Sequence, residues 1–386
     1  MKQRQYPVFL AKSGFSLVEL LICLAILAIL MTAILSSFTS TMQRSAQQSS
    51  IAETQIETDV GLELLRADLE HAGFGLPWQL PAVPSPYLEP APLADVSNIP
   101  KAIISEDTSG SSLNTSDYLV VRATNAIRGG SAQKWGYVGR DNNHNVIVQS
   151  LSDDLFTNNE GVIVLRPEVS SGVYRQLIMK GTGYIAKVKN QAVPLSLTLE
   201  DQDFAPPPTP NDPDGERFLV YGLNDDVNVR RPFNRTDYYI NNTNIPTHCA
   251  PQTGVLVKAT VNQADDNFFI MPIVDCVADF QVVYYLDTNG DGGWDQRANA
   301  SSLSGLSAEQ IRDQVKAVHC YILAHEGAVD RSFAYSNATI NVGDVDTAGT
   351  TLLAGRSFDL SATIGGNWAN YRWKVYSLAV VPKNLH

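Results

Sequence analysis

The chain has 386 residues and a formal net charge of −12, which leaves room for one large or two smaller folded domains after an N-terminal segment. The acidic balance favours solubility and argues against direct binding of nucleic acid, because that function needs a basic surface. The histidines and cysteines lack the spacing of a metal enzyme, and there is no serine nucleophile motif. The sequence therefore predicts neither catalytic residues nor an enzymatic activity.

The N-terminal segment combines a basic leader with a charged position beside an apolar run. The leader carries Lys2, Arg4 and Lys12 and no acid, which predicts that this end stays on the cytoplasmic side of a membrane. Residues 20–35 are almost wholly apolar, and Glu19 stands directly before them. A carboxylate inside a membrane costs about 2.5–3.5 kcal/mol on insertion scales, so such a charge usually has a function and a partner.

These residues resemble the N-terminal signature of the type IV prepilin family: a short basic leader, glycine, phenylalanine or methionine, and then Thr/Ser-Leu-x-Glu before an apolar helix. In that family a membrane peptidase cleaves after the glycine and methylates the new N-terminus. The resemblance implies cleavage between Gly14 and Phe15 and N-methylation of Phe15. It also implies that Glu19 pairs with the cationic amine of a neighbouring subunit, which would fix the register between stacked helices.

Two other interpretations of this segment fit less well. A secretory signal has an apolar core of about 7–15 residues, with its cleavage site after the core. Here Gly14 and Phe15 precede a longer apolar run. A plain signal anchor has no reason to carry Glu19.

The proline-free stretch that follows the leader, residues 1–14, predicts one continuous helix. We expect this helical domain over residues 15–75, with 15–38 in the membrane or in a filament core. Its second half carries an amphipathic stripe that should pack on a sheet; the stripe consists of Ile56, Val60 and Leu64 beside Leu62, Leu65, Leu69 and Ala72.

Residues 76–386 predict a β-rich globular domain. Short runs rich in β-branched and aromatic residues alternate with turn residues; they cover 118–122, 146–149, 162–165, 176–179, 184–188, 217–221, 254–261, 280–286, 315–324 and 373–381. Ser307 and Gln310 form a capping box that predicts a short helix over 308–314. The proline-rich stretch 205–213 is either a loop or a boundary between two lobes. The predicted fold is thus α+β, a long N-terminal α-helix packed on a large antiparallel β domain.

The C-terminal half resembles two related groups of pilin-like proteins. The strand over 274–285, the Asp/Gly-rich turn over 287–294 and the strand over 315–323 are similar to PilW-type minor pilins and to J-type pseudopilins of type II secretion. The ending over 380–384 is similar to the closing sequence of the PilW type, although Lys383 replaces the usual arginine. Chain length favours the PilW type, because J-type pseudopilins are generally shorter.

The resemblance implies a minor pilin that takes part in the assembly or initiation of a type IV pilus, at or near the pilus tip. Its partners would be other minor and major pilins, the prepilin peptidase, the inner-membrane assembly platform and a tip adhesin. Before assembly it would span the inner membrane once, with a cytoplasmic N-terminus and a periplasmic globular domain that the pilus later displays outside the cell. The alternatives are a J-type pseudopilin, or a tip-displayed adhesin whose loops around 77–115 and 201–248 form a binding surface.

Three cysteines lie in the predicted exported domain, so an oxidising compartment would leave one disulfide and one thiol. We expect Cys249 to pair with Cys276, because each lies just before a predicted strand. The alternative is Cys276 with Cys320, because their strands could be adjacent. Cys23 lies in the apolar helix as a small apolar residue.

The turn that starts at Asp287 matches the D-x-N-x-D-G opening of a calcium loop. Oxygen ligands from Asp287, Asn289 and Asp291, together with Asp295, would converge on a structural calcium ion. However, Ala298 replaces the bidentate glutamate of an EF-hand, and a strand precedes the loop in place of a helix. The alternative is an Asp/Asn/Gly turn that closes a hairpin. No other cofactor is expected.

Overall fold

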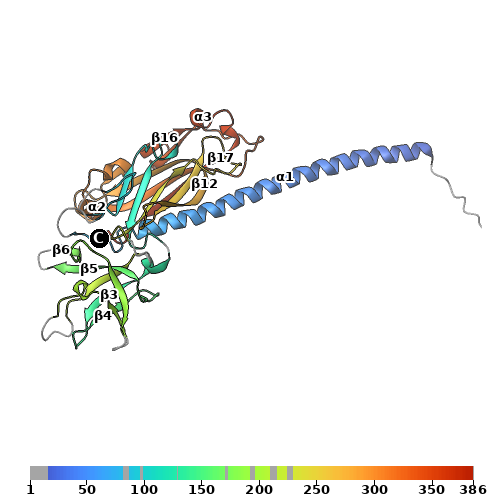
Figure 1. Cartoon of the computed structure of the whole chain (residues 1–386). Helices are drawn as coiled ribbons and strands as arrows, with labels where there is room; N and C mark the ends of the chain where they lie inside the picture. The colour runs from blue at the N-terminus through green and yellow to red at the C-terminus, as the bar shows by residue number, and fades with distance from the viewer. Residues whose placement is uncertain are drawn as a thin grey trace, which may run out of the picture. The chain divides into compact units, whose positions relative to one another are not determined.

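The computed structural model describes residues 16–80, 87–95, 99–127, 129–169, 173–191, 196–208, 215–223 and 229–385. The chain forms two compact units, residues 1–52 and 53–386. One helix, α1 (Leu17–Glu70), begins in the first unit and ends in the second (Figure 1). The long predicted helix is therefore confirmed, and its last turns belong to the globular unit.

An antiparallel sheet of eight strands is the largest element of the second unit. Its strands lie in the order β1-β2-β10-β11-β12-β14-β17, and β13 pairs with β12. Their bounds are β1 Ile103–Glu106, β2 Tyr118–Ala123, β10 Asn234–Asn241, β11 Gly254–Val261, β12 Phe268–Leu286, β13 Gln296–Asn299, β14 Val315–Glu326 and β17 Arg372–Val380. A hairpin of β15 (Thr339–Val345) and β16 (Leu352–Asp359) lies outside this sheet.

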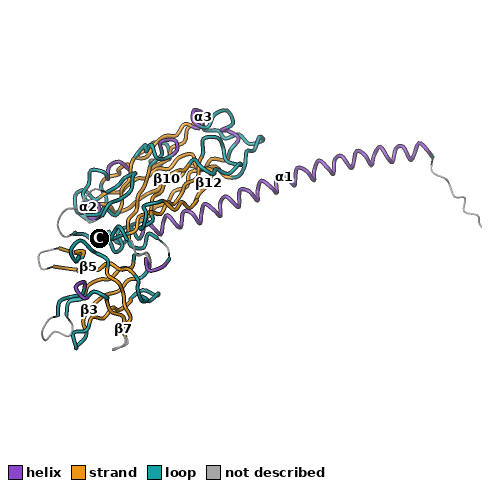
Figure 2. The backbone as a smooth tube through the Cα atoms, in the orientation of Figure 1, coloured by secondary structure: helices purple, strands orange, loops and turns teal. Residues whose placement is uncertain are grey.

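Seven further strands form a second sheet that closes on itself. Its path is β6-β5-β7-β8-β4-β3-β9, and β9 also pairs with β5, so six of the strands make a closed ring (Figure 2). Their bounds are β3 Trp135–Arg140, β4 Val146–Ser150, β5 Gly161–Val169, β6 Val173–Leu177, β7 Ala186–Gln191, β8 Ser196–Leu199 and β9 Phe218–Gly222. We call this element the barrel. Its interior is filled by aliphatic and phenylalanine side chains, among them Val138, Val162 and Phe218.

Short helices connect the strands. Two are α-helices, α2 (Ala308–Gln314) and α3 (Leu360–Thr363). Five are 3-10 turns, at Leu113–Thr115, Gly130–Gln133, Gln202–Phe204, Ala300–Leu303 and Trp368–Asn370. The predicted helix over 308–314 is confirmed in both bounds. Its predicted capping box is also present: Ser307 Oγ accepts the amide of Gln310, and the Gln310 side chain accepts the amide of Ser307.

The barrel is inserted into a hairpin of the main sheet. Strands β2 and β10 are direct neighbours, with Ala123 opposite Asn234, yet the whole barrel lies between them in sequence. The stretch 205–213 was expected to be a loop or a boundary between lobes. It lies in the connection between β8 and β9 of one sheet, and the lobe boundary stays a prediction. Residues 209–213 themselves lie outside the described residues.

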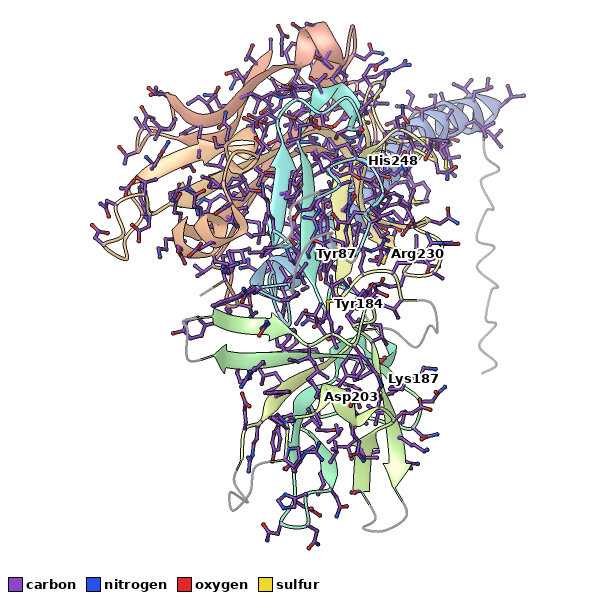
Figure 3. All side chains as sticks on the ribbon, turned by 60° about the vertical axis from the view of Figure 1, so that its left-hand side comes forward. Tyr87, Tyr184, Lys187, Asp203, Arg230 and His248 are labelled. Carbon is purple, nitrogen blue, oxygen red and sulfur yellow. A yellow bond between two sulfur atoms is a disulfide. The ribbon has the colours of Figure 1, made fainter. Side chains whose placement is uncertain are left out.

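Apolar packing joins the barrel to the segment that follows α1. Tyr184, Tyr221 and Leu223 of the barrel are buried in a cluster with Phe74. Figure 3 shows Tyr184 at this junction, whereas Lys187 lies further out on the barrel. Phe74 meets the ring of Tyr221 edge-on at 5.2 Å between centroids, a favoured aromatic geometry.

The main sheet is buried on both faces. On one face Val282 and Tyr284 join the core that contains α1, and on the other Val283 and Tyr285 pack beneath the β15–β16 hairpin. Burial on both sides explains why β12 ends in a continuous apolar run over 282–286, where a half-exposed strand would alternate with polar residues.

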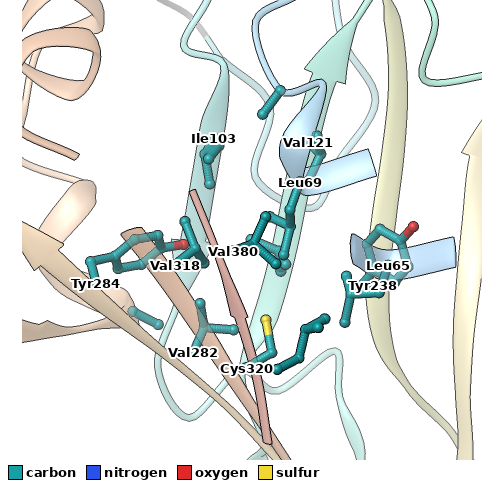
Figure 4. Close-up of a cluster of buried hydrophobic side chains, with 14 of the residues drawn as sticks. Leu65, Leu69, Ile103, Val121, Tyr238, Val282, Tyr284, Val318, Cys320 and Val380 are labelled. Atoms are coloured by element: carbon teal, nitrogen blue, oxygen red, sulfur yellow. The ribbon is translucent and has the colours of Figure 1, made fainter. Parts of the chain in front are cut away.

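The end of α1 is seated deeply in the main core (Figure 4). Leu65 and Leu69 are fully buried, and burial of each such side chain contributes about 1.5–3 kcal/mol. Gly61 lets the helix approach the sheet, because a Cβ at this position would lie 2.0 Å from the carbonyl oxygen of Ile273. The predicted amphipathic stripe thus packs on the sheet at Leu65, Leu69 and Ala72, whereas Ile56 and Val60 at its start are exposed.

A buried ion pair fixes the helix to two strands. Asp68 on α1 accepts hydrogen bonds from the Lys258 ammonium and, at 2.5 Å, from the Tyr238 hydroxyl. Lys258 and Tyr238 lie opposite each other on β11 and β10. All three side chains are buried, so the carboxylate and the ammonium depend on each other for compensation.

Buried arginines hold the segment 87–95 against the sheet. Arg122 donates to both carboxylate oxygens of Glu89, at 2.7 and 2.6 Å. Arg235 donates to Asp237 at 2.8 and 2.7 Å and to two backbone carbonyls of the segment. Burial raises the pKa of Glu89, but the Arg122 guanidinium outweighs it, so the net pKa lies below its usual value.

We predict that Asp68→Ala strongly destabilises the globular unit, because it leaves the Lys258 ammonium buried without a counter-charge. The expected loss is about 3–5 kcal/mol, measured by chemical unfolding of the full chain. Asp68→Ala combined with Lys258→Met should recover part of this loss. Asp59→Ala, at an exposed position of the same helix, should have little effect. A single variant as stable as the wild type would contradict the role of the pair.

We also predict an acid-dependent loss of stability through His325. This ring is fully buried, its Nε2 accepts the amide of Ala250 at 2.8 Å, and burial lowers its pKa to about 4. The unfolded chain has a histidine pKa of about 6.5, so protonation favours unfolding. The stabilisation is complete above about pH 6.5 and is lost as the pH falls toward 4. Unfolding curves across this range should be less pH-dependent for His325→Gln than for the wild type; equal slopes would refute the assignment.

Candidate functional site

The first part of α1 exposes its apolar side chains. Leu17, Ile22 and Ile29 are 77, 54 and 68% exposed, and other large apolar residues through Met42 are similar. The helix is long and apolar enough to cross a membrane. Such a surface needs lipid or neighbouring helices around it, because water solvates it poorly.

Glu19 lies in the first turn of this helix and is exposed. Its Oε2 accepts the backbone amide of Ser16 at 3.0 Å, and Ser16 Oγ accepts the amide of Val18 at 3.3 Å. Glu19 therefore caps the helix. The amide that bonds to its carboxylate belongs to Ser16, the residue that follows the predicted new N-terminus in the sequence. Sequence reasoning missed this cap, although Ser-x-x-Glu is a known signal for a helix start. Gly14 and Phe15 lie outside the described residues.

Two of the three cysteines in the globular unit pair as expected. Cys249 and Cys276 form a disulfide with 4.9 Å between their Cα atoms. The alternative bond of Cys276 with Cys320 is absent, because Cys320 is a free, buried thiol. His248 lies within 4.8 Å of both bonded sulfurs, but a disulfide offers no thiolate to a metal.

The Asp/Gly-rich turn satisfies its own hydrogen bonds. Asp287 accepts the amides of Gly290 and Gly292 at 2.7 and 2.9 Å, and Asp295 accepts the amide of Thr288 at 2.9 Å. Asp287, Asp291 and Asp295 are not among the groups of described acidic, His and Cys residues close enough to share an ion. Asn289 accepts the amide of Asp291 within the same turn. These bonds favour a plain turn, and the calcium site stays a prediction.

A polar cluster that sequence reasoning missed joins four strands, β12, β13, β14 and β15. Tyr285 of β12 and Tyr321 of β14 both donate their hydroxyls to Asp344 of β15, and Arg297 reaches the same carboxylate at 2.8 Å. The His319 ring stacks near Tyr285, with 4.2 Å between centroids. Because both carboxylate oxygens of Asp344 are paired, the cluster holds the β15–β16 hairpin against the main sheet. We call this cluster the clasp. Its residues come from distant segments, and no local pattern announces it.

Comparison with known proteins identifies the N-terminal segment. Residues 10–35 match the family described as the prokaryotic N-terminal methylation motif. No curated protein and no solved structure matches the chain. The match covers the leader and the start of α1, so it does not extend to the β domain.

The motif is typical of type IV prepilins and pseudopilins, and with the long helix on an antiparallel β domain it makes the chain a type IV pilin-like protein. This class implies processing by a prepilin peptidase and assembly with pilus components. The apolar helix with its motif suggests anchoring in the inner membrane.

The Asp/Gly turn gives a further prediction. Asp287→Ala leaves the amides of Gly290 and Gly292 without their acceptor, so the full chain should lose stability in calcium-free buffer. The matched control is Asp141→Ala, because Asp141 also accepts nearby amides but lies in another loop. Calorimetric titration tests calcium itself. Heat and a calcium-dependent rise in melting temperature that Asp287→Ala and Asp291→Ala abolish would support the ion; no heat and no rise would leave the turn alone.

Proposed function

We propose that the protein is a PilW-type minor pilin that takes part in the assembly or initiation of a type IV pilus, at or near its tip. The observation that carries the proposal is the methylation motif directly before an apolar helix whose side chains are uncovered in the single chain. Neighbouring pilin helices would cover these side chains in a filament. Packing among such helices buries apolar surface and holds subunits together.

The size of the globular unit supports a position near the tip. Besides the sheet that seats α1, the unit carries the barrel and the β15–β16 hairpin. A subunit of the shaft must fit closely beside copies above and below it. A subunit at the end has open space on one side and can carry this extra bulk.

Strand β12, the Asp/Gly turn with Trp294, α2 and β14 follow the order expected of PilW-type pilins. J-type pseudopilins share this order, so a pseudopilus of type II secretion is the alternative. Co-purification separates the two: pilins and the pilus assembly platform would support the first, and secretion pseudopilins the second.

The first prediction from this function concerns processing. The mature chain should begin at an N-methylated Phe15, because the peptidase needs a residue without a side chain at the cut and Gly14 supplies it. Mass spectrometry of the N-terminal peptide, from membrane-extracted protein, measures this. A mature chain that begins at Met1, or after Ser36, would contradict the proposed prepilin processing.

The second prediction separates the two roles of Glu19. Glu19→Ala and Glu19→Gln should both insert into the membrane, since each removes a costly charge. Gln can still accept the Ser16 amide, so it retains the cap but loses the charge. If Glu19 pairs with a neighbouring amine, both variants should be depleted several-fold from sheared pili. If only the cap matters, Glu19→Gln should be incorporated normally. Glu53→Ala, an exposed acid further along α1, is the control.

A further inference from the structure

A pocket of about 390 Å³ lies where the barrel side meets α2. Trp78 and Gln79 come from the segment after α1, Tyr174 from β6, and Glu309, Arg312 and Asp313 from α2. A volume of this size is within the range of small-molecule sites. The residues that line it come from three segments far apart in the sequence.

The pocket gathers polar side chains that the rest of the described chain does not satisfy. Gln79 Oε1 is buried and has no hydrogen-bond partner. Within the described ranges, the side chains of Glu309, Arg312 and Asp313 form neither a hydrogen bond nor an ion pair. Glu309 and Asp313 are exposed, but Gln79 Oε1 is buried, and buried polar groups are nearly always paired. An unpaired buried acceptor beside the Arg312 donor points to a ligand with hydroxyl groups.

Aromatic rings form the apolar part of the wall. Trp78 and Tyr174 meet at 6.2 Å between centroids, and Tyr174 is 48% exposed. The Arg312 and Arg175 guanidiniums lie 4.6 and 4.8 Å from the centre of the Trp78 ring. These cation–π contacts hold the guanidiniums in place, so their N–H groups are positioned before a ligand arrives.

The charges around the pocket balance. Arg312 lines the pocket together with the carboxylates of Glu309 and Asp313, and Arg175 lies close by, against the Trp78 ring. A strongly anionic ligand would meet the two carboxylates, and a cationic one would meet the two guanidiniums. An uncharged ligand that both donates and accepts hydrogen bonds, and has an apolar face for the rings, fits this set best.

We propose that this pocket binds a neutral saccharide of one or two rings. Ring hydroxyls would donate to Gln79 Oε1 and to the α2 carboxylates and accept from Arg312, while the C–H face of the sugar lies against Tyr174 and the edge of Trp78. This activity goes beyond assembly of a pilus and does not depend on it.

The test uses the full chain in a polyoxyethylene detergent, which has no sugar head group. Two neutral disaccharides, chitobiose and cellobiose, and one acidic disaccharide, digalacturonate, are titrated by calorimetry and by ligand-observed NMR. Binding of at least one neutral disaccharide is expected. A preference for chitobiose would indicate an N-acetylated glycan of the cell-wall kind, and a preference for cellobiose an unacetylated one. Binding of the acidic disaccharide alone, or of none, overturns the proposal.

Variants locate the site. Arg312→Met and Gln79→Met should each weaken binding about tenfold or more, because each removes a hydrogen bond in a partly buried site. Glu309 is exposed, so Glu309→Gln cannot disturb the core. This variant tests the site if the other two pocket variants fold poorly. Arg331→Met, an exposed arginine elsewhere, should bind like the wild type. Unchanged affinity in all three pocket variants refutes the site, whatever the outcome of the pilus experiments.

Discussion

The seating of α1 on the eight-stranded sheet is the constraint on which the rest of the globular unit depends. Gly61 brings the helix within backbone contact of β12, and Leu65 and Leu69 fill the space beneath. Asp68 fixes the rotation of the helix about its axis, because its two partners lie on adjacent strands. Apolar contacts alone would tolerate a rotation of the helix, whereas a buried carboxylate that needs Lys258 would not.

Buried charge recurs around this core. Arg122 and Arg235 are fully buried, and each is matched by a carboxylate and by backbone carbonyls. Paired in this way, the guanidiniums bind the irregular segment 87–95, which has few backbone partners of its own. Such pairs add little net stability compared with an apolar core, but loss of one partner is costly. They therefore favour one arrangement of the segment over others.

Local signals in the sequence predicted local structure well. The α2 helix was predicted from its capping box, and β11 from its apolar run, because both depend on neighbours in sequence. Strand β10 was missed as a full strand, since its Asn, Arg and Asp side chains read as a loop; they are buried because Arg235 and Asp237 pair with each other.

Long-range features were not predictable in the same way. Closure of the barrel rests on the pairing of β5 with β9, and no local pattern specifies it. The clasp around Asp344 and the pocket beside Trp78 likewise depend on contacts between distant segments. The residues around Glu19 predicted the match to the N-terminal methylation motif, and the pairing role of Glu19 stays a prediction. The helix cap could have been predicted from Ser16 and Glu19 but was not.

The insertion of the barrel between β2 and β10 bears on how the domain folds. The side chain of Asn234 donates to the carbonyl of Thr124, although 110 residues separate them. Closing a loop of this length in an unfolded chain costs conformational entropy before any contact repays it. A barrel that folds first brings its two ends together and removes most of that cost. The order of folding would then run from the insert to the host sheet, in keeping with synthesis, because six of the eight strands of that sheet follow the barrel in the chain.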